Sequence, residues 1–258
     1  MWKSWGADFI KVYPSLPWHL QTIVADEAQR QGLPLVGHAL TFDEMVRHVL
    51  QGYTSVEHTT SVMYSDGWKL MAAAGTRWVV TLTCEGGSEI FIHEQQERLS
   101  EPLVRSFVPP DKMRAALAGG RLSYYPREMQ RSNMKRAAAR VVAALRDGVK
   151  VRAGTDALMT EVFFGLSLHW ELEFLTQAGL SPLEALRIGT RGAAETNGAA
   201  LVLGTLTPGS LADIVLLDAS PLESIRNTSR VWRVIKDGQP FDPTTLRPSA
   251  ATAPASER

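Results

Sequence analysis

The chain has 258 residues, of which 45% are hydrophobic and 21% are charged, a composition typical of a globular protein with one large domain or two modest ones. Its 27 basic and 27 acidic residues balance, so no charge excess indicates nucleic-acid binding or disorder. The single cysteine, Cys84, excludes an internal disulfide framework. No apolar run is long enough to span a membrane, and the first residues lack the apolar core of a signal peptide. We therefore expect a soluble protein, and its compartment is left open.

The first expected element is a short strand over residues 6–13, rich in apolar and β-branched residues, which Pro14 ends. Lys11 lies within this strand, where burial of an unpaired ammonium is costly. Burial lowers the pKa of a lysine by favouring the neutral amine. That amine can act as a base, form a Schiff base or take up CO2 to become a carbamate. The alternative is a lysine whose side chain reaches from the strand end to water.

The same strand-and-helix unit then repeats along the chain. Helices are expected at 17–31, 42–51, 66–74, 135–146 and 169–177, and from 182 onward, and further strands at 33–38, 54–58, 77–83 and 149–153. Ser15 is a candidate cap for the first helix, and Gly32 is a candidate stop. Thr41 with Glu44 forms a capping-box pattern. His48, in the second helix, is expected to be at the surface or partly buried.

Residues 84–120 contain several prolines, which weaken the pattern, and we expect an irregular excursion over one end of the domain. Beyond the last helix the periodicity changes to turn-rich sequence with short β runs, and Asp237-Gly238 is a hairpin signal. We expect a small all-β appendage over 201–243. A disordered tail over 244–258 follows from its Pro, Ala, Ser and Thr content.

Alternating strands and helices with short connections predict an α/β fold with parallel pairing and right-handed crossovers. Five strands fit either a doubly wound sheet or part of a (β/α)8 barrel. In a barrel, functional side chains gather at the C-terminal ends of the strands. Four strands carry a metal-binding or proton-transferring residue at or near that end: Lys11, His38, His58 and Asp156. Their placement favours the partial barrel.

These four residues form a candidate site for divalent metal. Neutral imidazole suits zinc, and carboxylate or carbamate oxygens can bridge two ions. Two bridged zinc ions lower the pKa of a shared water and polarise a carbonyl, and Asp156 can take the proton of that water as general base. A single histidine at a strand end is more often structural, so the shared placement of the four residues is the stronger signal.

Seven segments match the motifs of a known family in their order and spacing: 6–11, 36–39, 55–58, 153–157, 168–172, 204–213 and 234–238. They resemble the amidohydrolase superfamily of metal-dependent hydrolases, in its imidazolonepropionase-related and prolidase-like branch. The resemblance implies the C-terminal part of a larger metal-dependent hydrolase, with strands 4 to 8 of the barrel over residues 1–200.

The resemblance also implies roles for single residues. Lys11 would be a carbamylated bridge between two zinc or other divalent ions. His38 and His58 would be ligands, and Asp156 would be both ligand and catalytic proton shuttle.

Two further residues are candidates for substrate binding. Tyr13 lies two residues from Lys11 and shares its strand face, so it either reaches the substrate or fills the barrel mouth. His169 either orients a substrate or ligand, or caps its helix.

One departure from the family is that the sequence contains no His-x-His pair, which the family carries on its first strand. The chain also begins directly in a strand. We therefore expect the C-terminal part of a larger hydrolase, or a truncated product. Such a chain would need the missing N-terminal barrel segment or another protomer, and open sheet edges favour a homo-oligomer.

The resemblance thus implies a hydrolase that acts on C–N bonds of a small amide or dipeptide-like substrate, with metal-activated water as nucleophile. A non-catalytic remnant of the same fold and a Schiff-base lysine barrel enzyme are the alternatives. No motif identifies the substrate, and none indicates nucleic acid or membrane as a partner.

Overall fold

The computed structural model describes residues 3–58, 64–119, 125–157, 160–196, 198–199 and 202–248. Five strands form one parallel sheet in chain order: β1 (Ile10–Val12), β2 (Leu35–His38), β3 (Ser55–Glu57), β4 (Arg77–Val80) and β5 (Val151–Ala153). Within these described ranges β1 and β5 are the two edges of the sheet. The five strands and their parallel pairing are as the sequence predicts, although each strand is shorter than expected.

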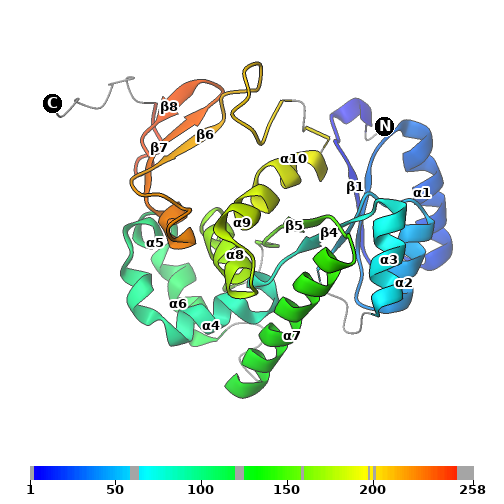
Figure 1. The fold of residues 1–258 in the computed structure, drawn as a ribbon, viewed down its shortest axis with the longest axis horizontal. Helices are drawn as coiled ribbons and strands as arrows, with labels where there is room; N and C mark the ends of the chain where they lie inside the picture. Colours follow the sequence, from blue (N-terminus) through cyan, green and yellow to red (C-terminus); the bar gives the residue numbers. More distant parts are fainter. Residues whose placement is uncertain are drawn as a thin grey trace.

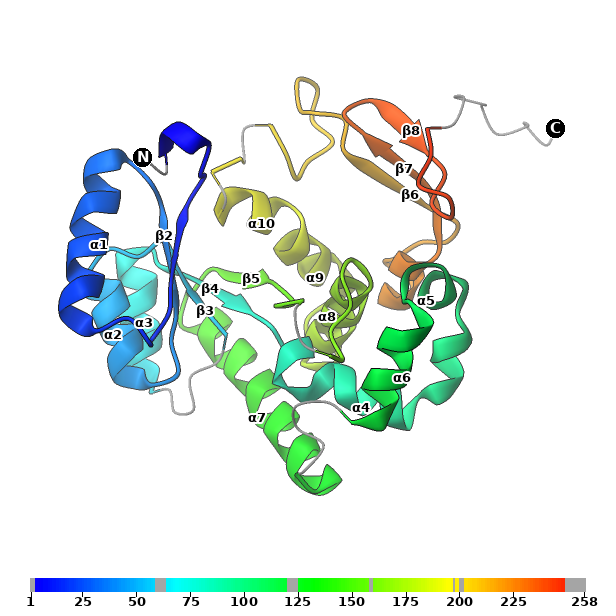
Figure 2. The same ribbon diagram turned by 180° about the vertical axis from the view of Figure 1, so that it is seen from behind.

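Helices connect these strands: α1 (Trp18–Gln31), α2 (Phe42–Leu50), α3 (Ser65–Ala74) and α7 (Arg127–Arg146). Figures 1 and 2 show α1, α2 and α3 beside one another on one side of the first strands. Three more helices follow β5, and they are α8 (Leu166–Gln177), α9 (Pro182–Gly189) and α10 (Arg191–Thr196). The sequence pattern did not indicate α10.

Local signals set several helix ends. Thr41 caps α2 in a complete capping box with Glu44, as predicted. Gly32 ends α1 in the left-handed conformation, which glycine adopts without steric cost. The start of α1 lies within one residue of the prediction, but Ser15 was wrongly predicted as its cap, because Pro17 precedes the first turn and no side chain caps it.

The segment between β4 and α7 is helical rather than irregular. It consists of η2 (Thr83–Gly87), α4 (Ser88–Glu94), η3 (Gln96–Ser100), α5 (Pro102–Phe107) and α6 (Pro110–Ala118). Pro102 and Pro110 occupy the first turns of α5 and α6, where a missing N–H costs nothing. These prolines start helices, so the expected disruption does not occur.

The main hydrophobic core lies between the sheet and the helices α2, α3, α7, α8 and α9, and a smaller cluster joins β1 and β2 to α1. His48 belongs to this packing, contrary to the prediction, since it is only 2% exposed. Its ring stacks on Tyr53 with the ring centroids 4.3 Å apart. Gly37 makes room for both rings, because a Cβ there would lie 2.7 Å from each.

A second sheet is antiparallel and contains β6 (Ile214–Leu217), β7 (Val231–Lys236) and β8 (Gln239–Phe241). Figure 1 shows it at the opposite end of the molecule from β1 and α1. The 3-10 turn η4 (Ile225–Ser229) packs against α8. The expected tail begins with an ordered turn, in which Thr244 and Thr245 donate to Asp242, and residues 249–258 lie outside the described residues. Within the described residues, no helix is long and apolar enough to cross a membrane.

Candidate active site

The side chain of Lys11 lies on the sheet face that carries the candidate site. Lys11 is half-buried in β1, and its Nζ lies 5.3 Å from the centroid of the Tyr13 ring. Burial lowers the pKa of Lys11 below its usual value, while the carboxylates of Glu57 and Asp156 act in the opposite direction. The neutral amine is thus more accessible here than in a solvated lysine.

Two histidines continue from Tyr13 across the strand ends. Tyr13 stacks on His38 with a centroid separation of 5.7 Å, and His38 lies 4.4 Å from His58 by the same measure. Nδ1 of the buried His58 is 2.8 Å from the hydroxyl of Thr81. This hydroxyl fixes the orientation of the ring, whose Nε2 faces Asp156.

Asp156 completes this group from the loop after β5. Its Oδ2 lies 3.8 Å from Nε2 of His58 and accepts a hydrogen bond from the thiol of Cys84 at 3.6 Å. Three strands therefore deliver His38, His58 and Asp156 to one place, and Lys11 is coupled electrostatically to Asp156. The structure brings these four sequence-predicted residues together.

A cavity of about 320 Å³ lies on the same sheet face, between the strands and α10. Lys11, Tyr13 and Glu57 are among its lining residues. Glu57 was missed as a site residue by the sequence analysis. A charged residue within a short strand, as at Lys11, was the signal that could have found it.

The environment of Glu57 differs from that of a surface carboxylate. Burial raises its pKa, while the hydroxyl of Ser55, which donates to Oε1 at 2.5 Å, and the nearby Lys11 lower it. The same cavity is thus lined by the Glu57 carboxyl, whose pKa burial raises, and by the Lys11 amine, whose pKa burial lowers.

His169 is not brought into this group within the described part of the chain. It lies in the first turns of α8, and burial lowers its pKa to about 4. The helix begins after Gly165, where no side-chain cap hydrogen bond is made. The described contacts give His169 no role at the candidate site.

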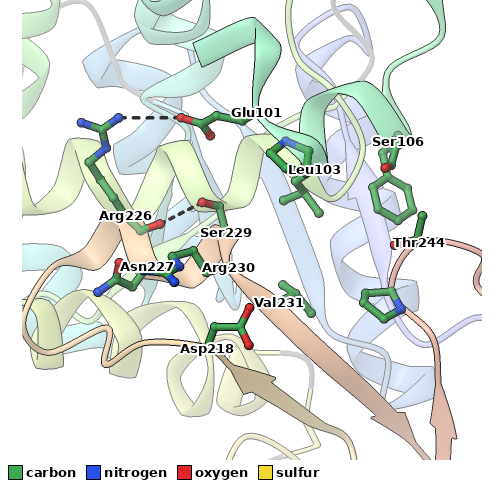
Figure 3. A pocket seen from close by; sticks show the side chains of 13 residues that line it. Glu101, Leu103, Ser106, Asp218, Arg226, Asn227, Ser229, Arg230, Val231 and Thr244 are labelled. Atoms are coloured by element: carbon green, nitrogen blue, oxygen red, sulfur yellow. Dashed lines mark hydrogen bonds and ion pairs between the residues drawn. The ribbon is translucent and has the colours of Figure 1, made fainter. Parts of the chain in front are cut away.

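A separate cavity of about 480 Å³ lies between α5 and the second sheet (Figure 3). Glu101 and Arg226 both line it and approach each other to 3.7 Å. None of the predicted site residues contributes to its wall. Its lining carries charges of both signs and gives no chemical reason to place the reaction there.

The candidate residues fit a divalent cation in the kind of donor they offer. Imidazole nitrogens from His38 and His58 and a carboxylate oxygen from Asp156 are the donors that zinc takes. Within the described ranges, however, no three His, Cys, Asp or Glu side chains are grouped closely enough to hold an ion on their own. These residues therefore offer donors of the kind that zinc binds, but further ligands would be needed to hold the ion.

Comparison with known proteins decides the family. A family model for the amidohydrolase family matches residues 6–240. The chain belongs to the amidohydrolase family. No curated protein sequence matches it.

Solved structures of similar fold include three hydrolases. A Xaa-Pro dipeptidase with bound methionine has a TM-score of 0.69 and 22% identity over 93% of this chain and 56% of its own. Molinate hydrolase has a TM-score of 0.68 and 18% identity over 99% and 56%. The A. niger ochratoxinase has a TM-score of 0.65 and 24% identity over 94% and 54%. The chain thus spans little more than half the length of these proteins, and their likeness establishes a TIM-barrel-type α/β fold.

Proposed function

We propose that this amidohydrolase-family chain forms part of a metal-dependent hydrolase that cleaves C–N bonds in amide or peptide-like small molecules. The observation that carries the proposal is the meeting of His58 and Asp156, 3.8 Å apart, at the ends of β3 and β5. The ring of His38 lies beside them. Imidazole and carboxylate donors from separate strand ends are the arrangement expected at the catalytic face of a barrel.

His38, His58, Asp156 and Lys11, the last as a carbamate, would hold zinc or other divalent ions. Such ions, when bound, lower the pKa of water and polarise a substrate carbonyl. Asp156 would accept the proton of the attacking water as general base and return it to the leaving nitrogen. Burial of Lys11 supports carbamate formation, because only a neutral amine reacts with CO2.

The cavity on the sheet face would receive the substrate. Tyr13 is half exposed at its wall, where its ring can contact the substrate beside Lys11. A role of His169 in orienting the substrate stays a prediction. It would require a further segment or protomer that brings the substrate to the start of α8. The related structures act on a Xaa-Pro dipeptide, molinate, ochratoxin and phenylurea, which makes small amides and their analogues the substrate class to test first.

Further ligands would come from outside this donor set. The sheet ends at β1 and β5 within the described residues, and the chain holds no His-x-His pair. We propose that a complementary N-terminal barrel segment, or another protomer, pairs with these edges and supplies the remaining donors. A homo-oligomer is the simplest assembly that would cover two open edges.

The test is hydrolysis by the zinc-loaded chain of Xaa-Pro dipeptides, N-acyl amino acids and phenylureas. Asp156→Asn should reduce the rate by about a hundredfold or more, as expected for loss of a general base. Asp66→Asn, at an exposed position in the first turn of α3, is the matched control and should not change it.

Three results would contradict the proposal. Zinc-independent turnover that survives Asp156→Asn would remove Asp156 from the chemistry. Trapping of a substrate carbonyl on Lys11 by borohydride would favour the Schiff-base alternative. A chain that binds zinc but hydrolyses none of these substrates would be the non-catalytic remnant.

A further inference from the structure

Glu171 is a fully buried carboxylate on α8, within the segment 168–172. It accepts three hydrogen bonds from residues far away in the sequence. The backbone N–H groups of Leu82 and Thr83 donate to it at 2.9 Å and 2.8 Å, and the hydroxyl of Thr83 donates at 3.0 Å. One side chain of α8 therefore accepts hydrogen bonds from two backbone N–H groups in the corner between β4 and η2, residues 81–84.

This corner, residues 81–84, touches the candidate site at both of its ends. At one end the hydroxyl of Thr81 lies 2.8 Å from Nδ1 of His58. At the other end the thiol of Cys84 donates to Oδ2 of Asp156 at 3.6 Å. The residues that Glu171 holds, Leu82 and Thr83, lie between these two contacts. A shift of the corner would therefore displace partners of His58 and Asp156 together.

The ionised form of Glu171 matches the three donors of the corner. Two oxygens that only accept can serve two backbone N–H groups and a hydroxyl at once. A glutamine has a single carbonyl oxygen, and its NH2 group would face a donor. Burial raises the pKa of Glu171 to about 8 against the opposite effect of the three donors, so the acceptor-only form is the main form above that pH, where the readouts below are compared. A buried acidic group that is this costly calls for a specific purpose, and all three of its hydrogen bonds go to the corner.

We propose that Glu171 is a positioning residue for the candidate active site, which fixes the corner 81–84 and through it the orientation of His58 and Asp156. The catalytic meaning of this role rests on the proposed function. The positioning itself does not, because the contacts exist without metal or substrate.

The single cysteine of the chain offers a direct probe of this positioning. Cys84 is buried against Asp156, so a neutral thiol reagent reaches it only when the corner opens. In Glu171→Gln the reagent should modify Cys84 about tenfold faster than in the wild type, because one corner N–H loses its acceptor. The matched control is Glu173→Gln, on the same helix, which removes the ion pair with Arg98 at 3.0 Å and leaves the corner intact. Its rate should stay within about twofold of wild type.

The ring nitrogens of His58 provide a second readout that general loosening of α8 would not move. In ¹⁵N-histidine NMR spectra, Glu171→Gln should change the tautomer signature of His58, because its Nδ1 partner Thr81 is displaced. Glu173→Gln should leave that signature unchanged. If Glu171→Gln does not fold by circular dichroism, Thr83→Val serves instead, since it removes only the hydroxyl donor. It should raise the Cys84 rate by a smaller factor.

A folded Glu171→Gln with wild-type Cys84 reactivity and an unchanged His58 signature would overturn the positioning role. The same changes in Glu173→Gln would also overturn it, because they would then report helix packing. These outcomes are separate from the proposed function. Altered readouts in a chain without any hydrolysis would leave the positioning intact and refute the hydrolase, whereas hydrolysis with unaltered readouts would do the reverse.

Discussion

His58 and Asp156 both take the left-handed backbone conformation, with φ of 68° and 53°, and their side chains turn toward each other to within 3.8 Å. They follow β3 and β5, which are separated in the sheet by β4. Positive φ costs a non-glycine residue about 1–2 kcal/mol. Such strain is held in place by surrounding structure and is concentrated at functional sites. The side chains of His58 and Asp156 thus approach each other through backbone conformations that are unfavourable for non-glycine residues.

The backbone of Asp156 gives the first prediction. Asn tolerates the left-handed region as Asp does, whereas a β-branched residue does not. Asp156→Asn should therefore keep the free energy of unfolding within about 0.5 kcal/mol of wild type, and Asp156→Val should lower it by about 1–2 kcal/mol. Urea denaturation measures both. Equal stabilities for the two variants would show that the conformation at this position is not constrained.

The close approach of β5 to β4 gives the second prediction. A Cβ on Gly154, two residues before Asp156, would lie 2.7 Å from Cγ1 of Val79. Gly154→Ala should destabilise the chain by about 1–3 kcal/mol through overpacking. In a Val79→Ala background the clashing methyl is absent, so the same substitution should cost much less. A double-mutant cycle by urea denaturation gives the coupling, and additive effects would contradict this contact.

The parallel sheet was predictable because each strand is a short β-rich run bounded by turn residues. The helices between the strands carry end signals such as Gly32 after α1 and the capping box at Thr41 before α2. The strand-end placement of Lys11, His38, His58 and Asp156 could likewise be predicted, since parallel strands carry their C-terminal ends to one edge.

Other features depend on contacts that no local pattern contains. The prolines of the segment 84–120 suggested irregularity, yet they start helices once α8 and α7 are there to pack against. His48 carries a polar ring, so its burial follows only from the neighbouring Tyr53 and Gly37. Glu171 was visible only as part of a motif, and its partners are 88 and 89 residues away.

Burial of His48 gives a third prediction, on pH. Burial lowers the pKa of His48 from about 6.5 to about 4. Between these values the unfolded chain binds a proton at His48 and the folded chain does not, so stability is lost as the pH falls through this window. The loss at pH 4 should be on the order of 3 kcal/mol for this residue.

Urea denaturation at pH 7.5 and pH 4.5 tests this effect. His48→Gln should show a smaller difference in stability between the two pH values than wild type. His19→Gln, at an exposed position on α1, is the control and should retain the wild-type difference. His169, whose pKa burial also lowers to about 4, contributes to the dependence that remains in His48→Gln. An unchanged difference in His48→Gln would contradict the assignment.

The most direct test of the account is the zinc content of the purified chain after equilibration with zinc and dialysis. The wild-type chain should retain at most one zinc ion, bound weakly through His38 and His58, as expected for an incomplete donor set. His58→Ala should lose it, whereas His19→Ala, which removes an exposed histidine from α1, should retain it. Equal zinc content in wild type and His58→Ala would contradict a metal site at the ends of β3 and β5.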